Sequence, residues 1–292
     1  MTRWPIGSPR WVIVRAEQLT GPVAYHGEGP VWSKRWGGLR WVDMLAGDVL
    51  SLAADGTVGR RHVGEVAAAI RPRSDGGAVI GLERGFALED DDQTISRLDE
   101  LWADDSVRMN EGGCDPDGRF YCGSMAYDQR PGAASVYRLD PDGNVQVVLD
   151  GVTVSNGLDW SPDGTRAYYN DTATHRVDVF DYDREAGLTS RRVFATVDGL
   201  PDGLTTDALG GVWVALSDRS AVHRYGPEGE LDAVVDVAAR KVTACTFGGR
   251  ELDELFITTS QEGLKAGEDG AAGSLFKVVP GVGGLPVREF AG

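Results

Sequence analysis

Cysteine is scarce in this sequence, and the spacing of the few cysteines present argues against a disulfide framework. The 292 residues include three cysteines, Cys114, Cys122 and Cys245, an odd number without a CxxC pair. Disulfide-stapled domains are typical of oxidising compartments and use an even set of closely spaced cysteines. The cysteines therefore predict buried structural thiols in a cytoplasmic protein. Residues 1–5 do not begin the long apolar core of a signal peptide, which agrees with that expectation.

Long apolar runs and an excess of basic residues are also missing. No run approaches the roughly 18 apolar residues that a membrane-spanning helix requires. Asp and Glu number 45 against 29 Lys and Arg, which gives a formal net charge of −16. Because nucleic acids and anionic membranes attract cationic surfaces, this balance disfavours both as partners. It is compatible with a site that attracts a cation.

Several familiar catalytic signatures are absent. The four histidines, at positions 26, 62, 175 and 223, show no HExxH or similar metal-binding spacing. The sequence has no Gly-x-Ser-x-Gly elbow, no phosphate-binding loop and no dinucleotide fingerprint. A candidate site must therefore be sought in residues that meet only after folding.

Glycine is abundant, with 40 residues, and it marks a repeat. Short runs of β-branched and aromatic residues follow Gly or Asp-Gly turns, as expected for strands. Six such runs begin at residues 38, 76, 118, 164, 210 and 253, so successive runs are 38 to 46 residues apart. A period of about 40–50 residues with several strands per unit is typical of propeller blades. We predict an all-β, six-bladed β-propeller with residues 1–292 in one domain, in preference to a two-sheet sandwich or two β domains.

Three turn-rich segments each offer one oxygen-bearing side chain beside glycine. They are Gly-Glu-Gly-Pro with Glu28, Ser-Asn-Gly-Leu with Asn156 and Pro-Asp-Gly-Leu with Asp202. Taken alone, each segment is an ordinary turn or loop. Carboxylate and amide oxygens nevertheless suit a hard divalent cation, and three protein ligands leave positions open for water and substrate. Since the innermost strands of all blades line one central channel, we predict that these side chains meet at its mouth around a metal ion.

A second group of polar residues precedes the third repeat. Arg108 and Asn110 alternate along an extended segment, so both side chains are expected on the same side, and Asp128 lies beyond the next strand. Arginine and asparagine together can hold a polyhydroxylated or carboxylate-bearing small molecule. The alternative is an exposed edge with a surface ion pair.

At these positions the chain resembles the SMP-30/gluconolactonase/regucalcin-like family, nearly from end to end. Several motifs occur in the family's order, and their combination is far more specific than any one of them. They are residues 27–32 (GEGPVW), 108–112 (RMNEG), 115–120 (DPDGRF), 155–161 (SNGLDWS), 201–203 (PDG), 243–249 (TACTFGG) and 273–276 (GSLF).

The resemblance implies a six-bladed propeller with one divalent metal and hydrolysis of a sugar lactone. Metal ligands carried over by position are Glu28, Asn156 and Asp202, with Asp202 also the catalytic base, and substrate contacts are Arg108, Asn110 and Asp128. The sequence departs from the family pattern at Glu111, where Asp usually follows the motif Asn. It also departs at Gly113, where some members carry Lys, and at Asp128, which replaces a common Glu. These differences bear on substrate choice more than on metal binding.

The predicted reaction is metal-dependent hydrolysis of an aldonolactone to the aldonic acid. Calcium is the favoured ion, with zinc, magnesium, manganese and iron as alternatives, because an all-oxygen ligand set leans to harder ions. A hydrolase of phosphotriesters or other esters on the same fold is one rival hypothesis. A non-enzymatic calcium-binding propeller is the other. We expect a monomer or a weak homo-oligomer, with a small-molecule substrate.

Overall fold

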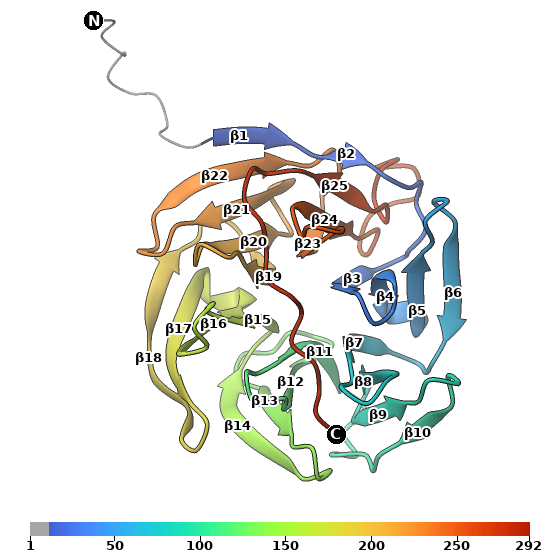
Figure 1. The fold of residues 1–292 in the computed structure, drawn as a ribbon, viewed down its shortest axis with the longest axis vertical. Coiled ribbons are helices and arrows are strands. Elements are labelled where there is room, and N and C mark those ends of the chain that lie inside the picture. The colour runs from blue at the N-terminus through green and yellow to red at the C-terminus, as the bar shows by residue number, and fades with distance from the viewer. Residues whose placement is uncertain (1–11) are drawn as a thin grey trace, which may run out of the picture.

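The computed structural model describes residues 12–292 and forms a ring of six sheets around a central axis (Figure 1). Five sheets have four strands and one has five, and neighbours along the chain pair antiparallel within each sheet. This is a six-bladed β-propeller, as predicted. The N-terminal stretch considered for a signal peptide lies outside the described residues. Within the described part of the chain, no helix is long and apolar enough to cross a membrane.

Each blade places its first strand at the hub, and the six hub strands are largely buried (Figure 1). These are β3 (Gly27–Ser33), β7 (Ala67–Pro72), β11 (Val107–Cys114), β15 (Ser155–Trp160), β19 (Pro201–Thr206) and β23 (Val242–Gly248). The second strands are β4 (Gly38–Asp43), β8 (Ala78–Leu82), β12 (Phe120–Ala126), β16 (Arg166–Asp171), β20 (Val212–Leu216) and β24 (Glu254–Thr259). The six runs that carried the sequence repeat are therefore the second strands of the six blades.

The outer positions of each blade are filled by the remaining strands. The third strands are β5 (Asp48–Leu52), β9 (Phe86–Glu89), β13 (Ala134–Leu139), β17 (Arg176–Asp183), β21 (Ala221–Tyr225) and β25 (Phe276–Val278). The outermost strands that follow in sequence are β6 (Val58–His62), β10 (Ile95–Arg97), β14 (Val145–Val152), β18 (Gly187–Thr196) and β22 (Leu231–Asp236). Two short 3-10 helices, η1 (Met44–Ala46) and η2 (Thr172–Thr174), follow second strands.

Strands from the N-terminal end of the described chain complete the last two blades. β1 (Val12–Arg15) pairs in parallel with β22, and β2 (Glu17–Gln18) pairs antiparallel with β25. Early and late segments thus share a blade, which closes the ring and covers two strand edges that would otherwise remain open.

The core lies between adjacent blades and is formed by large side chains from neighbouring sheets. Aromatic pairs bridge three of the blade interfaces with ring centroids 5.3 to 5.8 Å apart: Phe86 with Phe120, Tyr121 with Trp160, and Trp213 with Phe247. Edge-to-face pairs of this kind add about 0.5–1.5 kcal/mol each beyond the area they bury. All three cysteines are buried and free, as the sequence predicted.

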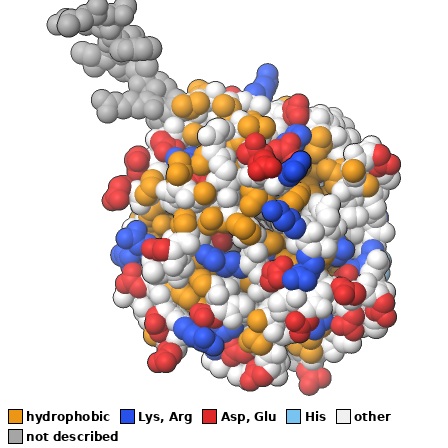
Figure 2. Space-filling model, in the orientation of Figure 1, with side chains coloured by type: hydrophobic (Ala, Val, Ile, Leu, Met, Phe, Trp, Pro, Cys, Tyr) orange, Lys and Arg blue, Asp and Glu red, His pale blue; other side chains and the backbone are white. Residues whose placement is uncertain are grey.

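The chain after β25 runs across the hub of the ring (Figure 1). Phe290 is almost fully buried, and its backbone pairs with that of Pro72 (N to O, 2.8 Å). Residues 285–288 line a small cavity of about 70 Å³ on the channel. Basic and acidic side chains are interspersed over the face seen in Figure 2.

Candidate active site

The hub strands share an irregularity that explains how side chains reach the channel. Each of the six has a break in register against the second strand of its blade. The breaks that matter here lie between Glu28 and Val31, Met109 and Gly112, Ser155 and Leu158, and Pro201 and Leu204. A bulge inserts residues without partners and re-aims their side chains. All of the predicted metal ligands lie at or within these bulges.

The glycines that follow the predicted ligands allow neighbouring hub strands to approach closely. A Cβ on Gly157 would lie 2.4 Å from the backbone nitrogen of Leu204, and one on Gly203 would lie 2.8 Å from the Cα of Ala244. Any larger residue would therefore force the strands apart. The sequence-based interpretation of these segments as turns, with Glu28 in a loop, is wrong: they are bulged strands, and glycine is needed there for packing.

Glu28, Asn156 and Asp202 line one cavity of about 180 Å³ at the hub, together with Arg108 and Asn110. All five residues are buried, with between 3% and 8% of their surface exposed. Side chains more than 170 residues apart in sequence thus face one common space. The structure brings together five of the six residues predicted from the sequence.

Asp128 is the residue that the structure leaves outside. Its side chain is mostly exposed and accepts hydrogen bonds from the backbone N–H of Arg130 (3.2 Å) and from Arg130 Nη1 (3.0 Å). These bonds lower the pKa of Asp128, and the bond from the backbone N–H has the larger effect. Its neighbour Gln129 lines the cavity instead. Substrate contact by Asp128 therefore stays a prediction without geometric support here.

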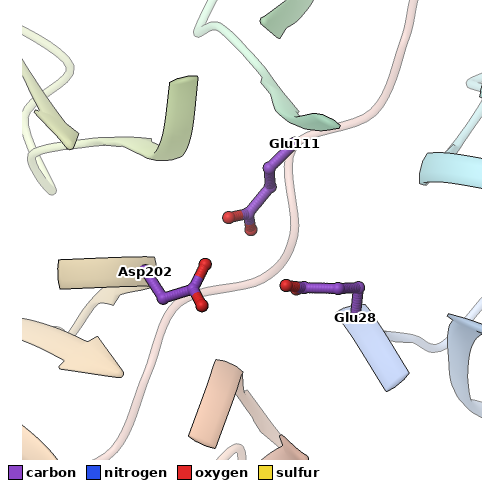
Figure 3. A group of neighbouring side chains, drawn as sticks. All are labelled: Glu28, Glu111 and Asp202. Atoms are coloured by element: carbon purple, nitrogen blue, oxygen red, sulfur yellow. The ribbon is translucent and has the colours of Figure 1, made fainter. Parts of the chain in front are cut away.

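A third carboxylate, which the sequence analysis did not propose as a ligand, converges on Glu28 and Asp202. One carboxylate oxygen each from Glu28, Glu111 and Asp202 lies within 4.8 Å of the other two, and Figure 3 shows the three side chains pointing toward a common centre. Burial, followed by the charges of Asp202 and Glu111, raises the pKa of Glu28 well above its usual range. Burial and the charge of Glu111 do the same to the pKa of Asp202.

This donor set fits a hard divalent cation. Ions such as calcium bind oxygen ligands at 2.3–2.6 Å, so opposed ligands are about 5 Å apart, which matches the spacing of the three carboxylates. Among residues 12–292, none of the three carboxylates forms an ion pair with Lys or Arg. Buried carboxylates without a counter-charge are unfavourable, and a cation between them would relieve both the burial and the mutual repulsion.

Hydrogen bonds fix the orientation of the Asn156 amide. The Thr172 hydroxyl donates to the Pro201 carbonyl (2.7 Å), so its oxygen is left to accept from Asn156 Nδ2 (2.8 Å). Asn156 Oδ1 then faces the other way and accepts from Asn110 Nδ2 (3.1 Å). The oxygen, which is the atom that can bind a cation, is therefore held toward Asn110, and the nitrogen toward Thr172.

Arg108 and Asn110 are held together as one polar unit. Arg108 Nη1 donates to Asn110 Oδ1 (2.7 Å) and to the Met109 carbonyl (2.9 Å), while its Nε has no partner. Arg108 also lacks a carboxylate within ion-pair distance among the described residues. The prediction that both side chains point to the same side is confirmed, and the alternative of an exposed edge is wrong. A buried guanidinium with free donors can bind oxygen atoms of a ligand in the cavity.

The wall formed by β3 and the last blade carries residues that sequence analysis missed. Lys241 donates to the Glu262 backbone carbonyl (2.8 Å), and its Nζ lies 3.4 Å from Glu262 Oε2. His26 Nδ1 is 2.6 Å from Ser260 Oγ, and burial lowers the pKa of His26 to about 4, so the ring is neutral at pH 7. Lys241, Glu262 and His26 all line the cavity. No local motif marks them: Lys241 and Glu262 flank the paired strands β23 and β24, and His26 meets Ser260 only where the chain closes the ring.

Fold and site together define a β-propeller with a buried acidic cluster and a polar, ligand-sized cavity at its hub. The sequence pattern of the SMP-30/Gluconolactonase/LRE-like region matches residues 26–261. This chain belongs to that family.

Named relatives share the fold along almost the whole chain. Regucalcin of Danio rerio is 35% identical over 280 residues, covering 91% of this chain and 95% of the relative. A solved calcium-binding protein, regucalcin from Agrobacterium tumefaciens, is 26% identical with a TM-score of 0.89, covering 96% of this chain and 99% of that one. A solved gluconolactonase from Xanthomonas campestris is 26% identical with a TM-score of 0.73, covering 89% and 87%.

Proposed function

We propose that this protein is a divalent-metal-dependent lactonase that hydrolyses a sugar lactone to the corresponding aldonic acid. The observation that carries the proposal is the meeting of Glu28, Asn156 and Asp202 with the Arg108–Asn110 pair in one cavity. Membership of a family that includes a gluconolactonase of similar fold supports the same reaction. We further propose that the propeller acts as one domain in the cytoplasm, which the buried free cysteines support.

Five residues of the cavity have a role in this proposal. Glu28, Asn156 and Asp202 would hold the cation, which supplies Lewis-acid polarisation of the lactone carbonyl when it is bound. Arg108 and Asn110 would orient the sugar hydroxyls, Arg108 through donors such as its unpartnered Nε. Asp202 accepts the proton of the attacking water as general base. The buried walls limit access of bulk water, so these charges act at short range in a medium of low polarity.

A calcium-binding protein without turnover is the second candidate, favoured by the names of the regucalcin relatives. It differs from a lactonase in what the cavity must contain. A calcium buffer has no use for a buried guanidinium with free donors, whereas a sugar-binding site does. The Arg108–Asn110 pair therefore favours the enzyme.

A substrate panel tests the proposal. The full chain is stripped of metal, reconstituted separately with calcium, zinc, magnesium, manganese or ferrous iron, and assayed on aldonolactones, simple esters and a paraoxon-type phosphotriester. We expect lactone hydrolysis that requires added metal and exceeds turnover of the phosphotriester. Tight metal binding without turnover of any lactone would support the binding protein. Turnover unchanged by chelation would refute the metal mechanism, and preference for phosphotriesters would reverse the substrate assignment.

The hydrogen bond from Asn156 to Thr172 yields a separate prediction. Thr172→Val keeps the shape of the side chain but removes the acceptor that orients the Asn156 amide. Because partners of this kind typically contribute about 10–100-fold to metal affinity, we expect weaker calcium binding by about 10-fold in isothermal calorimetry. Thr174→Val is the matched control, since the Thr174 hydroxyl donates only to the Asp171 carbonyl (2.7 Å). Equal affinities in both variants would show that Thr172 does not position the ligand.

A further inference from the structure

Glu111 occupies an unusual position between the two cavities of the channel. It lies in the bulge of β11 and lines the cavity bordered by residues 285–288, whereas Glu28 and Asp202 line the other cavity, with Arg108 and Asn110. Its carboxylate still comes within 4.8 Å of both acids (Figure 3). Glu111 therefore approaches the acidic centre from the side opposite the substrate cavity.

The Glu111 carboxylate lacks the partners that a structural role would supply. Glu111 is 5% exposed, and its Oε2 atom has no hydrogen-bond partner. Arg71 lines the same small cavity, yet no ion pair joins the two among the described residues. Another buried glutamate in the molecule does have charged partners: Glu89, 1% exposed, forms ion pairs with Arg40 and Arg61. A buried, unpartnered carboxylate aimed at two others points to a ligand between them.

We propose that Glu111 is an additional protein ligand of the cation, bound from the side of the channel that the C-terminal segment borders. This inference rests on the metal site of the proposed function and extends it by one ligand. Glu28, Asn156, Asp202 and Glu111 would then offer four oxygen donors, three of them charged. The cavity lined by Arg108 and Asn110 remains free for water and substrate, since Glu111 lines the other cavity.

The ligand set has consequences for the choice of ion. Calcium takes six to eight oxygen ligands and its affinity rises with the number of charged ones, whereas softer ions favour nitrogen and sulfur. A third carboxylate thus favours calcium over zinc. The length of the side chain also matters, because the family pattern usually places the shorter Asp at this position. Glu111→Asp keeps the charge but withdraws the carboxylate by one methylene.

Calorimetry on the metal-stripped full chain tests the assignment with calcium alone as the probe. We expect Glu111→Gln and Glu111→Asp to weaken calcium binding by about 100-fold. Residues that only support a metal ligand typically change metal affinity by about 10–100-fold, so this loss lies at the upper end of that range or beyond it. Glu89→Gln is the matched control, because it removes an equally buried carboxylate far from the hub. It is expected to lower thermal stability but to leave calcium affinity within about threefold of wild type, below the effect of an outer-shell residue.

A second readout counts water molecules on the ion. With terbium as the probe, luminescence lifetimes in H₂O and D₂O report the number of bound waters, and we expect one more in Glu111→Ala than in wild type. Unchanged affinity and hydration in the Glu111 variants would overturn this inference while leaving the three-ligand site intact. Failure of the wild-type protein to bind any divalent ion would instead remove the proposed function itself. If Glu111→Ala does not fold, calorimetry on the two conservative variants decides.

Discussion

Asp202→Asn is expected to lower sugar-lactone turnover by about 10²- to 10⁴-fold, the range that a positioned general base contributes. The amide has nearly the shape of the carboxylate and still offers one oxygen to a cation, but it cannot accept the proton of the attacking water. Asp202 is buried on β19 within the bulge between Pro201 and Leu204, so no exposed carboxylate can easily replace it. The measurement is kcat and KM at saturating calcium, which separates loss of base from loss of metal affinity.

A buried aspartate away from the hub provides the control for this experiment. Asp178 on β17 is 1% exposed and pairs with Arg176 and Arg191. Asp178→Asn should reduce thermal stability and leave kcat close to wild type. Near-normal turnover by Asp202→Asn would remove Asp202 as the base and direct attention to another acceptor in the cavity.

The arrangement of blades was predictable because it depends on a local pattern that repeats. The second strand of every blade begins after a turn and is apolar on both faces, since each blade packs against two neighbours. Strands such as β8 and β20, with every residue buried, therefore appear in the sequence as continuous apolar runs. Their regular spacing is sufficient to predict the number of blades.

The bulges at the hub were not predictable from local pattern. Asn-Gly and Asp-Gly are strong turn signals. Nothing in the local sequence indicates that a side chain at position 157 would clash with the backbone of Leu204 in the next blade. Only the packed ring shows that glycine serves close approach of strands there. The residues that the sequence singled out do face one cavity, but the reason given for their backbone was wrong.

The buried acidic cluster at the hub was predicted only in part, for a related reason. Glu28, Asn156 and Asp202 stand in motifs that the family resemblance makes visible, whereas Glu111 was noted only as a substitution for Asp. Its role depends on side-chain length and on the bulge between Met109 and Gly112, which direct the carboxylate into the channel. His26 and Ser260, which are 234 residues apart, meet where the chain closes the ring. Contacts of this range leave no trace in a local pattern.

Removing the cation is expected to destabilise the protein, and more so as pH rises. Without a cation, burial raises the pKa of Glu28 and Asp202 well above the usual range and that of Glu111 to about 7. A carboxyl group whose pKa is raised by folding stabilises the fold while protonated. That contribution is complete below the unfolded value, roughly 4, and is lost as pH rises through the folded pKa. The chelated protein should therefore lose stability between about pH 5 and 8.

Bound calcium should reverse this trend, because the cation requires ionised carboxylates and binds them more tightly as protons leave. At 100-fold excess over its dissociation constant a ligand stabilises the folded state by about 2.7 kcal/mol, which corresponds to roughly 5 °C in Tm for a chain of this size. Calorimetric scans at pH 5, 6.5 and 8, with EDTA or calcium, measure both effects. The gap between the two Tm curves should widen with pH in wild type and shrink in Glu28→Gln, which removes one of the three interacting charges. Parallel curves in wild type would mean that the three acids do not share an ion.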